Sequence, residues 1–199
     1  FGVAVEGVEE VWHAIRPPYA ELFDWVEGRG PQPTSADVPV FRPFMLAHPL
    51  EDGIVDLADY AAEWKWDGIR VQLVHVGGTT RLYSRAGDDI TGSFPDIAAA
   101  FRTPGVLDGE LMVKGEAQGS ALEEGAGAAS FNALQQRLGR KIVSAKMLDD
   151  YPAFVRLYDI LFDENDDLRA LPWTDRRTRL ESFAARLDSE RFDVSVLIE

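Results

Sequence analysis

Apolar residues recur at helical spacing near the start of the chain and then give way to a polar stretch. Between residues 5 and 27 they fall three or four positions apart, and Pro17-Pro18 interrupts the pattern. Because proline cannot continue a helix but is tolerated in its first turn, this pattern predicts two short helices. Residues 28–43 are rich in Gly, Pro, Ser and Asp, so we expect a linker and a domain boundary there.

From Phe44 onward the pattern is typical of strands and short helices. Alternating residues over 69–75, the pair Gly77-Gly78 and residues 79–84 predict a β-hairpin. Further strands are expected over 105–113, 154–162 and 194–198, with a polar turn over 163–167. Helices are expected over 95–101, over 130–138 with Ser130 as N-cap, and over 174–187 with Thr174 as N-cap. Residues 114–129, with Leu122 as their one large apolar side chain, predict a mobile surface loop.

Length and composition indicate a soluble globular protein. The 199 residues, 46% of them hydrophobic, are enough for one domain of ordinary size plus a fragment of another. The absence of cysteine excludes disulfides and thiolate metal sites and is compatible with a reducing compartment, so we expect a cytoplasmic protein. No apolar run approaches the roughly 20 residues that span a bilayer. The start at Phe1, without a signal-peptide pattern, favours a piece of a longer protein.

The net charge of −14, from 34 acidic and 20 basic residues, argues against a protein that simply coats nucleic acid, because such a surface is basic. A DNA-binding function would need local arginine clusters or contacts from another part of a longer protein. The three histidines are scattered and suggest neither a zinc site nor a catalytic base.

Lys65 is the strongest candidate for chemistry. It is the first of four lysines and lies in the run Glu63-Trp64-Lys65-Trp66-Asp67-Gly68-Ile69-Arg70. An amine attacks phosphorus only when it is neutral, and burial against the two tryptophan rings would lower its pKa, whereas the neighbouring carboxylates act in the opposite direction. From this run alone, a lysine that lies along a half-buried strand with an ion pair beside it is equally compatible.

Further motifs follow this run in a fixed order. They are Tyr83-Ser84-Arg85 with Asp88-Asp89-Ile90-Thr91 and Phe94-Pro95, Leu107-Asp108-Gly109-Glu110-Leu111, Phe131-x-Ala133-Leu134-Gln135-Gln136-Arg137, Leu157-Tyr158-Asp159-Ile160-Leu161, and Leu171-Pro172 with Arg176-Arg177-x-x-Leu180. Together they resemble the ATP-dependent DNA ligases of the covalent nucleotidyltransferase superfamily over about residues 41–199. The resemblance implies an α+β fold: an ATP-grasp-like adenylation domain of antiparallel sheets flanked by helices over 43–199, after the helical tail of a DNA-binding domain plus linker over 1–42.

The resemblance also implies a mechanism. Lys65 would attack the α-phosphate of ATP and carry AMP as a covalent adduct, with Mg²⁺ neutralising phosphate charge. The AMP would pass to the 5′-phosphate of nicked double-stranded DNA, and the 3′-hydroxyl would then seal the strand. A monomer with no membrane association is expected.

Six residues receive roles from the resemblance. Lys65 is the nucleophile, Glu63 accepts from the adenine amino group, and Tyr158 stacks on the adenine ring. Arg70 and Arg85 hold ribose and phosphates, and Glu110 contacts the ribose hydroxyls or Mg²⁺.

Structural alternatives exist for several of these residues. Glu110 is also compatible with an exposed strand carboxylate, Tyr158 with a core aromatic, and Arg85 with an ion pair to Asp88 or Asp89. For Arg176-Arg177-x-Arg179, a solvated helix face is favoured over DNA contact, and Asp67-Gly68 is expected to shape the turn after the lysine.

The chain also departs from the family pattern. No lysine follows Lys146, although complete ligases carry a Glu-Gly element, phosphate-gripping lysines and an OB-fold domain after the fourth motif. We therefore expect an internal fragment whose self-adenylation is slow or undetectable. The alternatives are an mRNA-capping guanylyltransferase or RNA ligase, a nucleotide-binding module without turnover, and, with less support, an NAD-dependent ligase.

Overall fold

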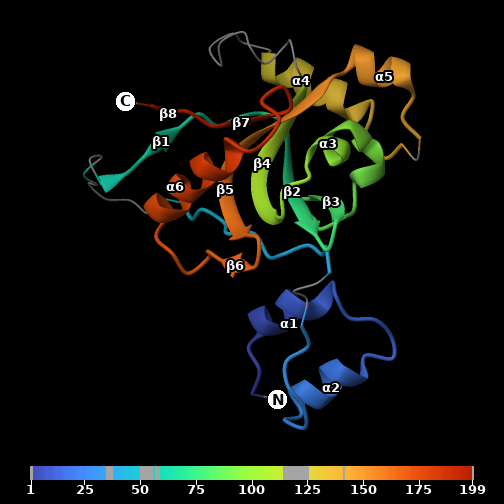
Figure 1. Ribbon diagram of the computed structural model, residues 1–199, viewed down its shortest axis with the longest axis vertical. Coiled ribbons are helices and arrows are strands. Elements are labelled where there is room, and N and C mark those ends of the chain that lie inside the picture. The colour runs from blue at the N-terminus through green and yellow to red at the C-terminus, as the bar shows by residue number, and fades with distance from the viewer. Residues whose placement is uncertain are drawn as a thin grey trace.

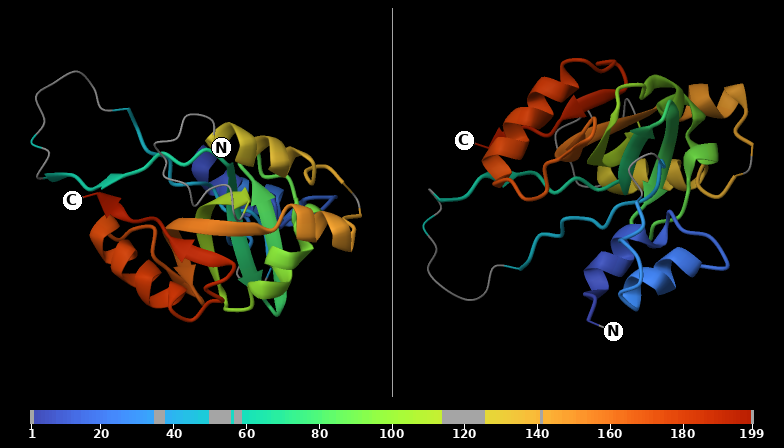
Figure 2. Two further views of the ribbon diagram at one scale, coloured as in Figure 1. Left: turned by 90° about the horizontal axis from the view of Figure 1, so that it is seen from above. Right: turned by 60° about the horizontal axis from the view of Figure 1, so that its bottom comes forward.

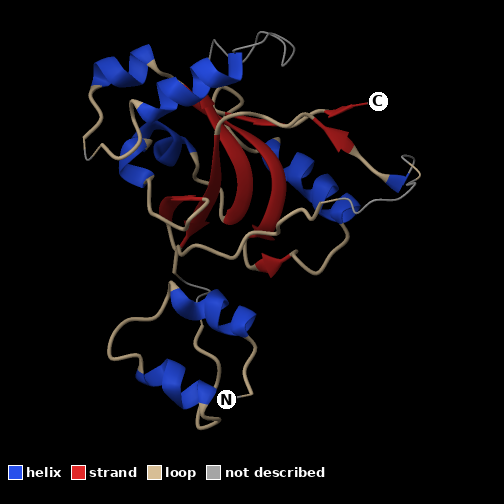
Figure 3. Cartoon of the chain, turned by 180° about the vertical axis from the view of Figure 1, so that it is seen from behind, coloured by secondary structure: helices blue, strands red, loops and turns tan. Residues whose placement is uncertain are grey.

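The computed structural model describes residues 2–34, 38–49, 56, 59–113, 126–140 and 142–198. Figure 1 shows two helices, α1 (Val5–Trp12) and α2 (Ala20–Val26), below a domain built around a curved sheet. The two predicted N-terminal helices are therefore confirmed. They pack on one another through a small core of Val11, Ile15 and Leu22. Figure 3, seen from behind, shows the same separation between this helical segment and the sheet.

The main sheet has the order β3-β2-β4-β5-β6, and β7 adds beside β5. All of its pairings are antiparallel except that of β5 with β7. The strands are β2 (Ile69–Val76), β3 (Thr79–Ser84), β4 (Gly105–Val113), β5 (Ala153–Asp163), β6 (Asp166–Asp167) and β7 (Phe192–Val194). The predicted hairpin and the predicted strands over 105–113 and 154–162 are confirmed. The predicted polar turn ends in β6, which folds back on β5.

A separate two-stranded sheet joins β1 (Ala62–Glu63) to β8 (Leu197–Ile198), with Glu63 opposite Leu197. The prediction of one strand over 194–198 was wrong, because the chain changes partner at Ser195. The buried Ser195 donates its backbone N–H to the carbonyl of Leu157, 2.8 Å away, and the chain then leaves β5 for β1. In both views of Figure 2 this small sheet lies on the side of the domain opposite to helix α5 (Ala145–Asp150).

The helices of this domain are α3 (Pro95–Ala100), α4 (Ala126–Gln135), α5 (Ala145–Asp150) and α6 (Trp173–Ala184), with a 3₁₀ turn, η2 (Thr91–Ser93), before α3. The helix predicted over 95–101 is confirmed. Helix α5 was not predicted, although Ser144 before it accepts a hydrogen bond from the Met147 N–H, 3.3 Å away, as an N-cap does.

Two predicted helix starts were wrong. Helix α4 begins at Ala126, so Ser130 lies inside it, because the alanines before Ser130 are strong helix formers. The predicted loop over 114–129 is therefore incorrect for 126–129, and 114–125 lie outside the described residues. Helix α6 begins at Trp173, directly after the extended Pro172, which leaves Thr174 within its first turn.

The core lies on one face of the sheet. Successive residues of a strand point to opposite faces, and Val71, Leu73, Leu107 and Leu111 pack against α3, α4 and α6. The intervening positions of β2 and β4 belong to the other face, which carries a smaller apolar cluster of Val74, Val106 and Leu161 as well as the polar side chains of the predicted motifs. Within the described residues, no helix is long and apolar enough to cross a membrane.

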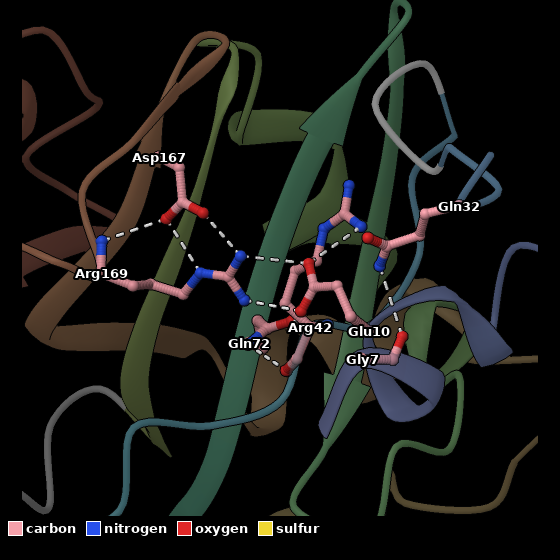
Figure 4. Close-up of polar contacts among 7 residues, drawn as sticks. All are labelled: Gly7, Glu10, Gln32, Arg42, Gln72, Asp167 and Arg169. Carbon is pink, nitrogen blue, oxygen red and sulfur yellow. Dashed lines mark hydrogen bonds and ion pairs between the residues drawn. The ribbon is translucent and has the colours of Figure 1, made fainter. Parts of the chain in front are cut away.

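Charged side chains join the helical segment to the sheet (Figure 4). Glu10 of α1 accepts hydrogen bonds of 2.6 and 3.2 Å from Arg169, which also pairs with Asp167 beside β6. Glu10 lies 3.6 Å from the guanidinium of Arg42, whose backbone N–H and carbonyl bind the side chain of Gln72 at 2.7 and 3.1 Å. This network connects α1, the linker and the centre of β2.

Candidate active site

The polar face of the sheet begins with two cross-strand pairs between β2 and β4. Arg70 is opposite Glu110, and Gln72 is opposite Asp108. Because their neighbours Val71 and Leu107 are core residues, strand alternation places these four side chains on the face away from the core. The first and third predicted motifs are therefore adjacent in space.

A β-bulge in β5 supplies two further polar residues. In the register of β4 with β5, Gly109 pairs with Leu157 and Asp108 pairs with Asp159, so Tyr158 has no partner. An extra residue in one strand breaks the simple alternation of side chains. Tyr158 and Asp159 are consecutive, yet both line the same cavity.

That cavity has a volume of about 330 Å³, within the range of small-molecule sites. It is lined by residues that precede β1 and by residues of the sheet and of α6: Met45, Leu46, Ala47, Glu63, Arg70, Tyr158, Asp159, Trp173 and Arg176. Three of the predicted site residues, Glu63, Arg70 and Tyr158, thus meet in one cavity. It combines two aromatic side chains, two guanidinium groups and two carboxylates.

Glu63 is half-buried and accepts a hydrogen bond of 2.9 Å from Arg177 of α6. Burial raises the pKa of Glu63, attraction to Arg177 lowers it, and repulsion by Asp159 raises it again.

The arginines of α6 hold the carboxylates of the cavity. Arg176, 7% exposed, donates to both oxygens of Asp159 at 2.8 and 3.0 Å, and the Arg177 side chain is 11% exposed. The predicted solvated helix face was therefore wrong for these two residues. Arg179 is 45% exposed and pairs with Asp163. Sequence reasoning missed these roles because the acidic partners are distant along the chain.

The guanidinium of Arg70 lies over two aromatic rings. Its guanidinium carbon lies 4.1 Å from the centre of the Phe44 ring and 5.7 Å from that of Tyr158. One end of the guanidinium donates to Asp108 at 3.2 Å. The role of Phe44 was not predicted from the sequence.

Asp108 is fully buried, and sequence analysis assigned it no role. Burial raises its pKa to about 7, although the hydrogen bond from Gln72 and the attraction of Arg70 oppose this rise. Gln72 donates to Asp108 at 3.0 Å and links it to the backbone of Arg42. An acidic residue in the middle of an apolar strand was the signal that could have indicated this role.

Glu110 binds the backbone of the first motif. It accepts a hydrogen bond of 3.0 Å from the Gly68 N–H. Burial raises the pKa of Glu110, while the Gly68 bond and the charges of Arg70 and Lys65 lower it. A Cβ at position 68 would lie 2.3 Å from the Leu111 carbonyl oxygen, so only glycine fits there.

Lys65 is exposed, and the expectation that two tryptophan rings bury it was wrong. Trp64 is 43% exposed. The Trp66 ring is turned away, because its Nε1–H donates to Ser195 at 3.0 Å and Arg156 stacks on it at 4.1 Å. Lys65 is near enough to Glu110 for its charge to lower the pKa of that carboxyl group.

Arg85 is exposed and lies outside the cavity that contains Glu63. It lines a second cavity, of about 480 Å³, together with Trp12 of α1, Phe41 and Phe44. Of its two predicted acidic partners, Asp89 pairs with Arg81 at 3.4 Å and Asp88 accepts from Ser84. Arg85 thus faces the helical segment and not the Glu63 cavity.

The described residues contain no cluster of three His, Cys, Asp or Glu side chains that could hold a metal ion. Magnesium bound to a nucleotide needs only one or two protein carboxylates, because phosphates and water complete its coordination. Glu110, with Asp67 near enough to raise its pKa, fits that requirement.

Comparison with known proteins identifies the family. The family model described as "ATP dependent DNA ligase domain" matches residues 44–197. The chain belongs to this family. This match confirms the resemblance of the motifs to ATP-dependent DNA ligases, and it does not include helices α1 and α2.

Similar proteins agree with the family assignment. A DNA ligase from Pyrobaculum neutrophilum is 33% identical over 187 residues, which cover 90% of this chain and 31% of that protein. A DNA ligase from Methanococcoides burtonii is 31% identical over 75% of this chain and 26% of that protein. The chain thus spans about a third or less of the length of these ligases.

Among solved structures, the ligase domain of LigD from M. tuberculosis is similar to this ligase domain. The TM-score is 0.50 and the sequence identity 30%, over 70% of this chain and 40% of that one. This similarity confirms the predicted α+β nucleotidyltransferase fold.

Proposed function

We propose that this protein is the adenylation core of an ATP-dependent DNA ligase and that Lys65 carries AMP. One observation carries the proposal: Glu63, Arg70 and Tyr158 line one cavity, and Lys65 lies two residues from Glu63 with Glu110 nearby. The family assignment supports ligase chemistry at this site.

In the first step, the neutral Nζ of Lys65 forms a bond to the α-phosphorus of ATP. The bond from that phosphorus to the bridging oxygen breaks, pyrophosphate leaves, and the nitrogen loses a proton to solvent. Because Lys65 is exposed, the bound nucleotide, and not the tryptophan rings, must remove water from the amine.

The second and third steps use DNA. A 5′-phosphate oxygen at a nick displaces Lys65 from the AMP phosphorus, and the amine takes up a proton. The 3′-hydroxyl then attacks the activated 5′-phosphorus, forms the phosphodiester bond, and releases AMP and a proton. Nicked double-stranded DNA is the substrate that this sequence of steps requires.

The residues that line the cavity support the following proposal for the nucleotide contacts. Glu63 accepts from the adenine amino group, Tyr158 stacks on the ring, and Arg70 binds the ribose and phosphate side. Glu110 binds the ribose hydroxyls or Mg²⁺, which supplies charge neutralisation for the phosphates when bound. Arg85, outside this cavity and facing α1, is assigned to the 5′-phosphate of the nick.

The family match over residues 44–197 supports the second part of a domain assignment. We propose that residues 1–42 are the end of a DNA-binding domain plus linker and that residues 43–199 belong to the adenylation domain. The Glu10–Arg169 ion pair supports a fixed arrangement of the two parts.

One observation favours a second candidate function. The exposure of Lys65 is compatible with a module that binds a nucleotide and does not form the covalent adduct.

Covalent labelling separates the two functions. The parent-length protein is incubated with Mg²⁺ and ATP labelled at the α-phosphate, and protein-bound label is measured after denaturation. We expect label on the wild type and on Lys146→Ala, an exposed lysine paired with Asp150, and none on Lys65→Ala. Label retained by Lys65→Ala would overturn the assignment of the nucleophile. Saturable ATP binding without label in any variant would favour the binding module.

A further inference from the structure

Arg177 supports the carboxylate of Glu63 from outside the cavity. Its Nη1 donates to Glu63 at 2.9 Å, and its Nη2 donates to the carbonyl of Ser195 at 2.8 Å. The Nε of the same guanidinium donates to Glu181 at 2.7 Å. Because each of its three nitrogens donates a hydrogen bond, the planar guanidinium of Arg177 has a fixed orientation.

The Ser195 contact extends this support to both sides of Lys65. The Oγ of Ser195 accepts from Trp66, which follows Lys65, whereas Glu63 precedes Lys65 by two positions. Pairing of β1 with β8 holds Glu63 opposite Leu197. The backbone around Glu63 is therefore held independently of any ligand, and Arg177 determines the direction of its carboxylate.

Charged and titratable groups reach Glu63 from each element packed around it. Arg177 on α6 attracts it, and Asp159 on β5 repels it. Arg176 on α6 pairs with Asp159, while Arg70 on β2 and Tyr158 on β5 line the same cavity. Arg177 is the group that directly bonds to Glu63, and its hydrogen bond occupies Oε1.

We propose that Arg177 is a positioning residue that selects the purine: it holds the Glu63 carboxylate aimed into the cavity, so that the site accepts from an amino group and rejects a carbonyl. An ionised carboxylate has only acceptor positions, whereas a protonated one also has an O–H donor. Adenine presents an amino group and guanine a carbonyl at the corresponding ring position. This inference rests on the proposed function.

Loss of Arg177 leaves two influences that favour the protonated form of Glu63. Burial and the repulsion of Asp159 both raise the pKa of Glu63, and the opposing attraction and hydrogen bond of Arg177 are then absent. A protonated Glu63 can donate to the guanine carbonyl. The preference for ATP over GTP should therefore fall in the variant, and fall further as the pH is lowered.

The test compares the dissociation constants of ATP and GTP by equilibrium binding at about pH 6 and about pH 8, because burial raises the pKa of Glu63 and a lower pH favours its protonated form. Arg177→Gln should reduce the ratio of GTP to ATP dissociation constants at least about tenfold, with the larger loss at the lower pH. Arg177→Lys, which keeps the charge and loses the fork, should retain part of the preference. Arg179→Gln, an exposed arginine on the same helix, should match the wild type.

A second variant distinguishes a loss of purine preference from a general loss of folding. Glu63→Gln carries an amide that accepts and donates at every pH, so its loss of preference should not depend on pH. Adding Arg177→Gln to Glu63→Gln should then reduce the preference no further, because the two residues act as a unit.

Two results would overturn the proposal. One is an Arg177→Gln protein that keeps the wild-type preference at both pH values. The other is an equal loss of affinity for both nucleotides without pH dependence, which would indicate a structural role alone. A wild type that prefers ATP but forms no lysyl adduct would refute only the proposed catalysis, whereas a wild type that binds neither nucleotide would refute both.

Discussion

The Gly68 N–H donates to the Glu110 carboxylate at 3.0 Å and so joins two motifs that are 42 residues apart in the chain. Gly68 follows Lys65 by three positions, and Glu110 lies on β4 opposite Arg70. The backbone that carries the proposed nucleophile is thus held against the strand that carries the proposed metal ligand. The position of Lys65 relative to the cavity depends on this bond.

Gly68→Ala should weaken this attachment. The new Cβ would lie 2.3 Å from the Leu111 carbonyl oxygen and 2.9 Å from the Glu110 Cγ, so the Lys65 segment must move away from β4. We expect a cost of about 1–3 kcal/mol in the free energy of unfolding, typical of overpacking, and at least a tenfold loss in adduct formation. Gly92→Ala is the control, because no atom lies within 4 Å of its Cβ position. Denaturant unfolding measures the change in stability, and the rate of labelling by α-labelled ATP measures adduct formation. An unchanged labelling rate would contradict this role of Gly68.

Asp108 should make stability depend on pH. Its pKa rises from 3.8 to about 7 on burial, so the folded protein binds this proton more tightly than the unfolded chain. The contribution of Asp108 to stability therefore falls as the pH increases from 3.8 to about 7. Asp108→Asn should remove this part of the pH dependence, whereas the exposed Asp149→Asn should retain it. Denaturant midpoints across this range test the sign, and an identical pH profile for Asp108→Asn and wild type would refute it.

Ser195 should matter because it holds the ring of Trp66. Ser195→Ala leaves the indole N–H without its acceptor at 3.0 Å, and loss of such a bond at a buried site costs about 1–3 kcal/mol. We expect a lower unfolding free energy and slower adduct formation, since Trp66 adjoins Lys65. Ser182→Ala on the exposed side of α6 loses a hydroxyl that donates to the carbonyl of Thr178. This control should change neither the unfolding free energy nor the rate of adduct formation. If Ser195→Ala leaves the contribution of Trp66 to the tryptophan fluorescence unchanged, taken as the difference from a matched Trp66→Phe variant, the predicted release of the ring is contradicted.

Glu10 should hold the helical segment to the sheet domain. Glu10→Gln weakens the ion pair with Arg169, which contains two hydrogen bonds of 2.6 and 3.2 Å. The side chains of Glu10 and Arg169 are only 21% and 24% exposed. We expect faster amide hydrogen exchange in α1 and a stability loss of about 1 kcal/mol. The exposed Glu21→Gln on α2 is the matched control. Unchanged exchange in α1 would show that apolar contacts alone hold the segment.

The local pattern of the sequence determined much of the fold. Alternation over 69–84 and the apolar run over 105–113 predicted β2, β3 and β4, because a strand that buries one face must repeat every second residue. The order of the motifs also indicated the family and brought Glu63, Arg70 and Tyr158 forward as site residues. Residue types and spacing suffice to indicate the family and these site residues, because they determine which chemical groups are available.

Only the tertiary structure decided how these residues meet. Tyr158 and Asp159 line one cavity because of a bulge, and that bulge depends on the pairing of β5 with β4. The hydrogen bond between Arg177 and Glu63 joins residues that are 114 positions apart. The exposure of Lys65 likewise depends on Arg156 and Ser195 turning the Trp66 ring away from it. Periodicity records which face of an element is apolar. Contacts between polar groups distant in the chain depend on how complete elements pack, and the sequence pattern holds no local signal for them.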